Sequence, residues 1–185
     1  MASSGIPRWG AIGLVLGSVI WVVLGLSSVV GYLQAIPGRE DVVLFVVAML
    51  LTAAGLVGLH TLQKDSYGRL GRTGFYVALA AIAAHVLGAV LYLAGNSAFQ
   101  WLSSPVGAFG MLIGFVLYGI ATLRARVLPR WYGLTLAVSM PVSLGLGHLL
   151  AAYWSSLSFG LFFLVLGYAL WSWRSTAAEG ASRVS

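Results

Sequence analysis

The chain alternates between long apolar runs and short polar gaps. Six mostly apolar runs of about 17 to 24 residues recur along its length. A helix of about 20 apolar residues crosses the roughly 30 Å hydrocarbon core of a bilayer and satisfies its own backbone N–H and C=O groups. The pattern therefore predicts an all-α fold, an integral membrane bundle of six transmembrane helices that forms a single domain over residues 1–185. The helices are expected at about residues 10–33, 42–62, 73–94, 105–124, 131–152 and 157–173.

The gaps between the runs carry turn-forming and charged residues. Residues 36–41 (IPGRED) close the first gap, and residues 95–105 form the third, with Pro105 suited to the first turn of a helix. The fifth gap, residues 153–156, is the weakest, but merging the runs beside it would give one helix too long for a bilayer. The first run is longer than the apolar region of a signal peptide, so we expect it to be retained.

Composition agrees with a membrane protein. Hydrophobic residues make up 60% of the chain and charged residues 8%, against roughly 25% charged in ordinary soluble domains. The net charge of +6 lies in the gaps and not along a soluble face, which disfavours nucleic acid as a partner. Because the chain has no cysteine, disulfides and thiolate chemistry are excluded.

The distribution of basic residues predicts an orientation. Lys and Arg near helix ends favour the cytoplasmic side of a membrane. With six helices, one side receives nine of the ten basic residues and the other receives Arg39 alone. We therefore expect a multi-pass protein of the cell membrane with both termini in the cytoplasm. The nine are Arg8, Lys64, Arg69, Arg72, Arg124, Arg126, Arg130, Arg174 and Arg183.

Two local motifs suggest a relationship, one with other proteins and one between two parts of this chain. The turn LRARVLPRWYG, residues 123–133, resembles an arginine-rich Leu–Pro–Arg–Trp turn in uncharacterised families of small prokaryotic multi-helix membrane proteins. That resemblance implies a bacterial origin and no particular activity. Residues 58–62 (GLHTL) also match residues 119–123 (GIATL), each followed by a basic loop and a Tyr–Gly pair, which either duplication or chance explains.

Acidic residues stay outside the predicted helices. The four carboxylates all fall in gaps or in the carboxyl-terminal tail, and the sequence contains no HExxH motif. Paired-acid catalysis, carboxylate proton relays and metalloprotease chemistry are therefore disfavoured, and we expect neither an enzyme nor a metal site. The four are Glu40, Asp41, Asp65 and Glu179.

Two of the three histidines occupy different kinds of position. His60 lies at the boundary of its apolar run, where an imidazole commonly reaches headgroups or water, so an interfacial role is favoured over a ligand role. His85 lies in the middle of its run and should face the bundle interior. It is expected either to form an interhelical hydrogen bond or to bind a ligand. Small residues and one tyrosine share its helical face: Ala78, Ala81, Gly88, Ala89 and Tyr92.

Pro141 marks a second candidate site. It cannot donate a backbone hydrogen bond, so its helix should kink beside His148 and leave room for a ligand, although packing alone also explains such kinks. We expect a pocket between the third and fifth predicted helices, and Pro141→Ala should weaken binding there. The tentative ligand-binding residues are His85, Tyr92, Ser139, Pro141, Ser143 and His148.

Glycine pairs suggest where helices approach each other. Gly13 and Gly17 in the first run, and Gly110 and Gly114 in the fourth, have GxxxG spacing. Because the chain has 24 glycines, packing within the bundle is favoured over a dedicated dimer surface.

These patterns favour a non-enzymatic membrane component, either an accessory subunit of a larger assembly or a binder of a small apolar ligand. The alternative is an electron-transfer protein that binds haem or quinone through His85 and His148, whose depths differ by about five residues or roughly 7 Å along the bilayer normal. A small transporter is the third candidate. The expected partners are the lipid bilayer and either other membrane subunits or an apolar small molecule.

Overall fold

The computed structural model describes residues 6–31, 39–150 and 152–182. Within these ranges the fold is all-helical and has six long helices, as the apolar runs predict. A seventh, short segment leads directly into α5: α4 (Phe99–Trp101) followed by the π-helical turn η1 (Leu102–Ala108). The long helices are α1 (Ile6–Gly31), α2 (Arg39–Gln63), α3 (Gly68–Leu93), α5 (Phe109–Ala125), α6 (Arg130–Leu149) and α7 (Ala152–Ser182).

The fourth apolar run departs most from the expected boundaries. Its helical structure begins at Phe99 and not at Pro105, which lies inside η1. Proline lacks the N–H of a regular α-helical hydrogen bond, and the wider π turn accommodates it without ending the helix. Asn96 forms a turn just before this helix, in which its side-chain oxygen accepts a hydrogen bond from the Ala98 backbone N–H at 2.9 Å.

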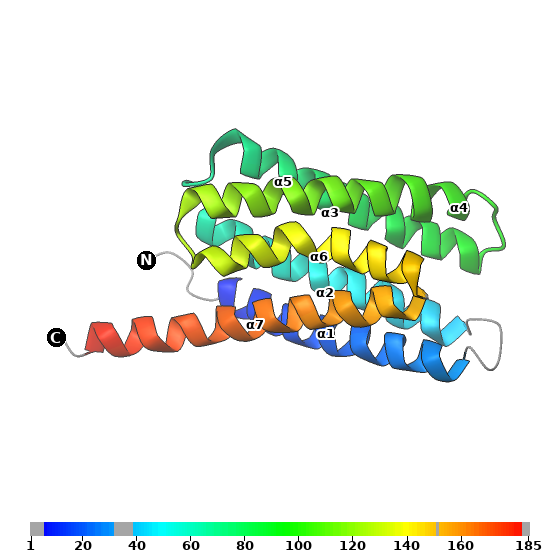
Figure 1. The fold of residues 1–185 in the computed structure, drawn as a ribbon, viewed down its shortest axis with the longest axis horizontal. Helices are drawn as coiled ribbons and strands as arrows, with labels where there is room; N and C mark the ends of the chain where they lie inside the picture. The colour runs from blue at the N-terminus through cyan, green and yellow to red at the C-terminus, as the bar shows by residue number, and fades with distance from the viewer. Residues whose placement is uncertain (1–5, 32–38, 151, 183–185) are drawn as a thin grey trace.

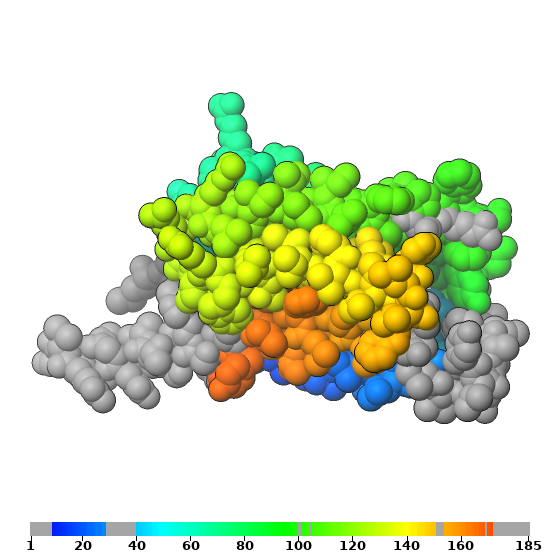
Figure 2. All heavy atoms as spheres, in the orientation of Figure 1, coloured from blue at the N-terminus to red at the C-terminus, as the bar shows by residue number. Residues whose placement is uncertain are grey.

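The six long helices form a closed ring. Each packs against its neighbours along the chain, and α7 returns to pack against α1 (Figure 1). Figure 2 shows one side of this ring, where α5, α6 and α7 lie one below the other. The contact between α2 and α3 is the smallest of the six neighbouring pairs. This arrangement encloses a central space and leaves one sparsely packed side.

Helices of this length and composition are compatible with an integral membrane protein. Four of the described helical segments are long and apolar enough to cross a membrane: Trp9–Ser28, Glu40–Gln63, Gly68–Leu93 and Pro105–Ala125. The apolar part of α7, Trp154–Tyr168, is shorter. Large apolar side chains are exposed around the bundle, including Leu16, Leu50, Ile113 and Leu161, each more than half exposed. Lipid would cover such a surface, and six crossings remain a prediction.

Glycines let the helices approach each other within the ring. A Cβ added to Gly58 of α2 would lie 2.7 Å from the Cα of Gly10 in α1, so neither position has room for a side chain. In α5, Gly110 and Gly114 face Ala81 and Ala78 of α3. The expectation that GxxxG pairs pack within the bundle is confirmed for this pair.

Charge is distributed unevenly between the two ends of the bundle. The α2–α3 and α5–α6 connections lie at the end where α1 begins and α7 ends (Figure 1). We call this the basic end, and its basic residues are Lys64, Arg69, Arg72, Arg124, Arg126 and Arg130. At the opposite end, the first turn of α2 carries Arg39 together with Glu40 and Asp41. Positive side chains are thus concentrated at the basic end, where Asp65 is the acidic residue of the α2–α3 connection.

Candidate ligand cavity

A cavity of about 150 Å³ lies at the centre of the ring, and we call it the inner cavity. Every long helix contributes to its lining. On α2 and α6 the contributing residues are four apart, Phe45 with Met49 and Met140 with Leu144, the spacing that places side chains on one helical face. The remaining lining residues are Trp21, His85, Ala108, Met111, Ser155, Ser156 and Phe159.

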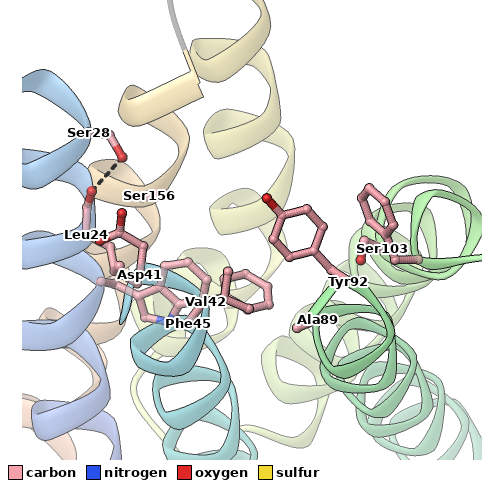
Figure 3. A pocket seen from close by; sticks show the side chains of 11 residues that line it. Leu24, Ser28, Asp41, Val42, Phe45, Ala89, Tyr92, Ser103 and Ser156 are labelled. Carbon is pink, nitrogen blue, oxygen red and sulfur yellow. Dashed lines mark hydrogen bonds between the residues drawn. The ribbon is translucent and has the colours of Figure 1, made fainter. Parts of the chain in front are cut away.

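A second cavity of about 310 Å³ adjoins the first toward the end opposite the basic one, and we call it the outer cavity. The two cavities share Trp21, Phe45 and Ser156 as lining residues. Figure 3 shows Tyr92 projecting from α3 on one side, with Val42 and Phe45 of α2 on the other. The outer cavity therefore lies on the sparsely packed side of the ring. Its other lining residues are Leu24, Ser28, Asp41, Ala89, Phe99 and Ser103.

Aromatic pairs form the walls of both cavities. Trp21 meets Phe45 edge to face, with ring centroids 5.4 Å apart and planes at 83°, and it meets Phe159 at 5.1 Å and 75°. Tyr92 and Phe99 form a further edge-to-face pair at 4.9 Å and 71°. The indole N–H of Trp21 donates a 3.3 Å hydrogen bond to the hydroxyl of Thr52. Such contacts fix the orientation of each ring before any ligand arrives.

His85 is the polar group of the inner cavity. Its ring lies 5.7 Å from that of Phe45, and its Nδ1 faces Gly107 of η1. Nδ1 is buried and makes no hydrogen bond of regular geometry within the described residues, although the ring lies near the backbone carbonyl of Ala81 one turn earlier on α3. The interhelical hydrogen bond expected for packing is therefore not made by this nitrogen. A buried imidazole atom without a partner is costly, so the site favours a ligand or water that supplies one.

The structure separates the residues that the sequence groups around Pro141. His85 and Tyr92 line the inner and outer cavities respectively. Ser139 and Ser143 are buried, but Ser139 donates to the Leu136 carbonyl, and Ser143 accepts a 3.1 Å hydrogen bond from the Ser158 hydroxyl. Their neighbours Met140 and Leu144 line the inner cavity in their place.

Pro141 and His148 point away from that cavity. Both are exposed, and α6 remains helical from Arg130 to Leu149. A separate hollow of about 410 Å³ lies between α6 and α7, and Val142, Leu146 and Ser158 contribute to its lining, whereas Pro141 does not. His85 and His148 are not brought to one cavity. The inner cavity is also well below the roughly 300–1,000 Å³ of pockets for drug-sized ligands, so a haem does not fit there.

His60 takes part in packing near the basic end. Its ring stacks on Phe75 of α3 at 3.9 Å and 15°, and its Nδ1 is hydrogen-bonded to the Tyr67 hydroxyl. Burial raises the pKa of Tyr67 to about 12, so the phenol stays neutral in this contact. His60 therefore connects α2 to α3 through these contacts. The contact with headgroups or water that its position in the sequence indicated stays a prediction.

Sequence reasoning missed most of the aromatic lining, although one signal was present. Trp21 falls in the middle of an apolar run, whereas tryptophans of membrane proteins gather near the interfaces. A central tryptophan therefore needs an internal contact, and the structure supplies Thr52, Phe45 and Phe159. Phe99 could not be found this way, because the predicted helix began six residues later.

The fold and the cavities define a class: a ring of apolar helices, compatible with an integral membrane protein, around an aromatic-lined internal site. No protein-family model, curated protein or solved structure matches the chain. Among the residues that the structure describes, no three His, Cys, Asp or Glu side chains gather closely enough to hold a metal ion. The function must therefore be argued from the cavities themselves.

Proposed function

We propose that this chain is an integral membrane protein that binds a small, largely apolar ligand inside its helical ring. The observation that carries the proposal is the pair of adjoining cavities that begins at Tyr92 and Asp41 and ends at the unpartnered Nδ1 of His85. Sites for small molecules are typically concave and mostly apolar, with a few polar groups that fix orientation. His85 is the polar group of this kind in the inner cavity.

The volumes limit the ligand. A cavity of about 150 Å³ with apolar walls accepts benzene in other proteins, so the inner cavity suits one aromatic ring. The outer cavity, at about 310 Å³, lies at the lower end of the usual range for ligand pockets. A ring with one hydrogen-bonding substituent would fill the inner cavity and give the His85 imidazole a partner. Binding thus needs neither a metal nor a catalytic residue.

The experiment compares 4-methylphenol with toluene, which differ by one hydroxyl. Binding to the full chain in lipid nanodiscs is measured by equilibrium dialysis, and empty nanodiscs correct for partition into lipid. Wild-type protein should bind both saturably and should prefer the phenol. In His85→Leu the preference for the phenol should fall roughly fivefold, because one hydrogen bond contributes about 1 kcal/mol to binding. His148→Leu is the matched control, because His148 is exposed on α6.

The absence of saturable binding of either compound by wild-type protein would reject the proposal. Co-purification of stoichiometric membrane subunits in mild detergent would then support the accessory-subunit function. If His85→Leu keeps the preference for the phenol, the polar contact with the ligand must lie outside the inner cavity.

A further inference from the structure

The outer cavity combines aromatic rings with a carboxylate, and this combination recognises a particular class of ligand. We propose that it binds the cationic head of a small lipophilic ammonium compound between the Trp21–Phe45 and Tyr92–Phe99 pairs, beside Asp41. The inference rests on the proposed function and names the ligand class of the same site. Aromatic faces attract ammonium groups, and several rings around one position can recognise a quaternary ammonium ion.

The rings come from separate elements that converge on one space. Trp21 lies on α1 and Phe45 on α2, whereas Tyr92 lies on α3 and Phe99 on α4. Each pair is held edge to face, at 5.4 Å for the first and 4.9 Å for the second. Because the rings already constrain each other, little side-chain entropy remains to be lost when a cation binds.

Asp41 supplies the charge complementarity. It is the one charged side chain among the lining residues that the structure describes for the outer cavity. It lies four residues before Phe45, which itself lies four before Met49, so one face of α2 carries the carboxylate, the aromatic wall and part of the inner lining. A negative group at the mouth attracts cations and disfavours anions.

The overall charge of the chain does not oppose this. The net charge of +6 comes from basic residues gathered mainly at the basic end, away from the outer cavity. At the opposite end, the first turn of α2 carries Arg39, Glu40 and Asp41, a net charge of −1, and Asp41 also interacts within the chain. The nearby balance is therefore one net negative charge, because the exposed charges of the basic end are farther away than about 10 Å and are largely screened at ordinary ionic strength.

Helix stability alone accounts for two acidic residues at the start of α2, since negative side chains favour a helix N-terminus. That explanation applies equally to Glu40 and Asp41. Their surroundings differ, because Glu40 is exposed while Asp41 lines the outer cavity beside Phe45. Glu40→Gln is therefore a matched control, which removes the same charge from the same helix turn and leaves the cavity unchanged.

The rest of the ligand must be apolar. An ammonium group in the outer cavity can extend its substituent past Trp21 and Phe45 into the inner cavity, which Met49, Met111 and Phe159 line. Benzyltrimethylammonium has this form, with one ring and one permanent cation. Neopentylbenzene has nearly the same shape and no charge, so the two compounds isolate the contribution of the charge.

Binding of both compounds is measured in nanodiscs by the same dialysis method for wild type, Asp41→Asn and Glu40→Gln. Wild type should bind the ammonium compound at least about tenfold more tightly than its neutral isostere. Asp41→Asn should reduce that preference roughly tenfold, and Glu40→Gln should retain it. Tyr92→Leu should also weaken binding of the cation, whereas Tyr76→Leu should not, because Tyr76 is 62% exposed on the same helix and lines neither cavity.

The outcomes separate the two proposals. Equal binding of the cation and its isostere by wild type would overturn the ammonium inference and leave the apolar ligand site intact. A preference for the cation that survives both Asp41→Asn and Tyr92→Leu would also overturn it. If wild type binds neither these two compounds nor toluene, the proposed function fails together with the inference.

Discussion

The imidazole of His85 rests directly against Gly107, with Nδ1 so near the glycine Cα that a methyl group at position 107 would overlap the ring. Gly107 lies in η1, the π-helical turn around Pro105. The contact with Gly107 thus sets how far the His85 side chain extends from α3 into the inner cavity.

Gly107→Ala should force the His85 ring toward the cavity or push η1 away from α3. Overpacking of this kind typically costs about 1–3 kcal/mol, so the variant should unfold at a lower temperature in detergent and bind toluene more weakly. Gly145→Ala is the control, because a Cβ there meets no atom within 4 Å and alanine favours a helix over glycine. Equal stability of the two variants would contradict the contact between His85 and Gly107.

His85→Leu should leave the free energy of unfolding unchanged within about 1 kcal/mol or raise it, because it removes a buried Nδ1 that has no partner among the described residues. Thermal unfolding without added ligand is the measurement. A loss of more than about 1 kcal/mol would instead indicate that the imidazole makes a stabilising hydrogen bond, as the packing hypothesis from the sequence requires.

Tyr67→Phe should destabilise the α2–α3 connection, because it removes the hydrogen bond to His60. The expected loss is about 0.5–1.5 kcal/mol in the free energy of unfolding, measured near neutral pH. Tyr76→Phe is the control, since that side chain is largely exposed on α3. An equal effect of both substitutions would show that the hydrogen bond contributes nothing specific.

Alkaline pH should act on the same residue. Burial raises the pKa of Tyr67 to about 12 in the folded protein, whereas an unfolded tyrosine titrates near about 10. The folded state therefore prefers the neutral phenol, and this contribution is complete below pH about 10 and declines as the pH rises toward about 12. Wild type should lose stability across that window faster than Tyr67→Phe, in thermal unfolding at stepped pH. Parallel curves for the two proteins would contradict the raised pKa.

The orientation predicted from the basic residues can be tested with reporter tags. Tags after Ser185 and in the loops near Arg69 and Ala125 should be cytoplasmic, and a tag near Gln100 should be external. The carboxyl-terminal tag is the most informative, because an external position would overturn both the expected orientation and the even number of crossings.

The number of long helices could be predicted from the sequence, whereas one helix boundary and the contacts of each helix could not. Apolar runs report where a backbone must satisfy its own hydrogen bonds, and all six appear as helices. Pro105 led to a wrong start for the fourth predicted helix. Proline is common in the first turn of a helix, but here it lies inside a π-helical turn.

Part of the candidate site could also be predicted from the sequence. His85 and Tyr92 stood out because polar side chains are rare in apolar runs, and both line cavities. Ser143 stood out for the same reason, yet its hydroxyl is hydrogen-bonded to that of Ser158, fifteen residues later in the chain. Which side of α6 faces inward depends on the ring closing through α7, and no local pattern in the sequence specifies that closure.

The splayed pair α2 and α3 has a consequence for how a solute arrives. The two helices touch where His60 stacks on Phe75, and farther along they stand on either side of the outer cavity, at Val42 and Tyr92. In a bilayer such an entrance faces hydrocarbon as well as water, so a solute can reach it after dissolving in lipid. For the proposed ligand, this route would change rates and leave the equilibrium as it is. A compound that concentrates in the bilayer meets the entrance more often, so its association rate, referred to the aqueous concentration, would rise with its partition coefficient. The affinity for free compound in water would stay the same, because the solute has the same chemical potential in both phases at equilibrium.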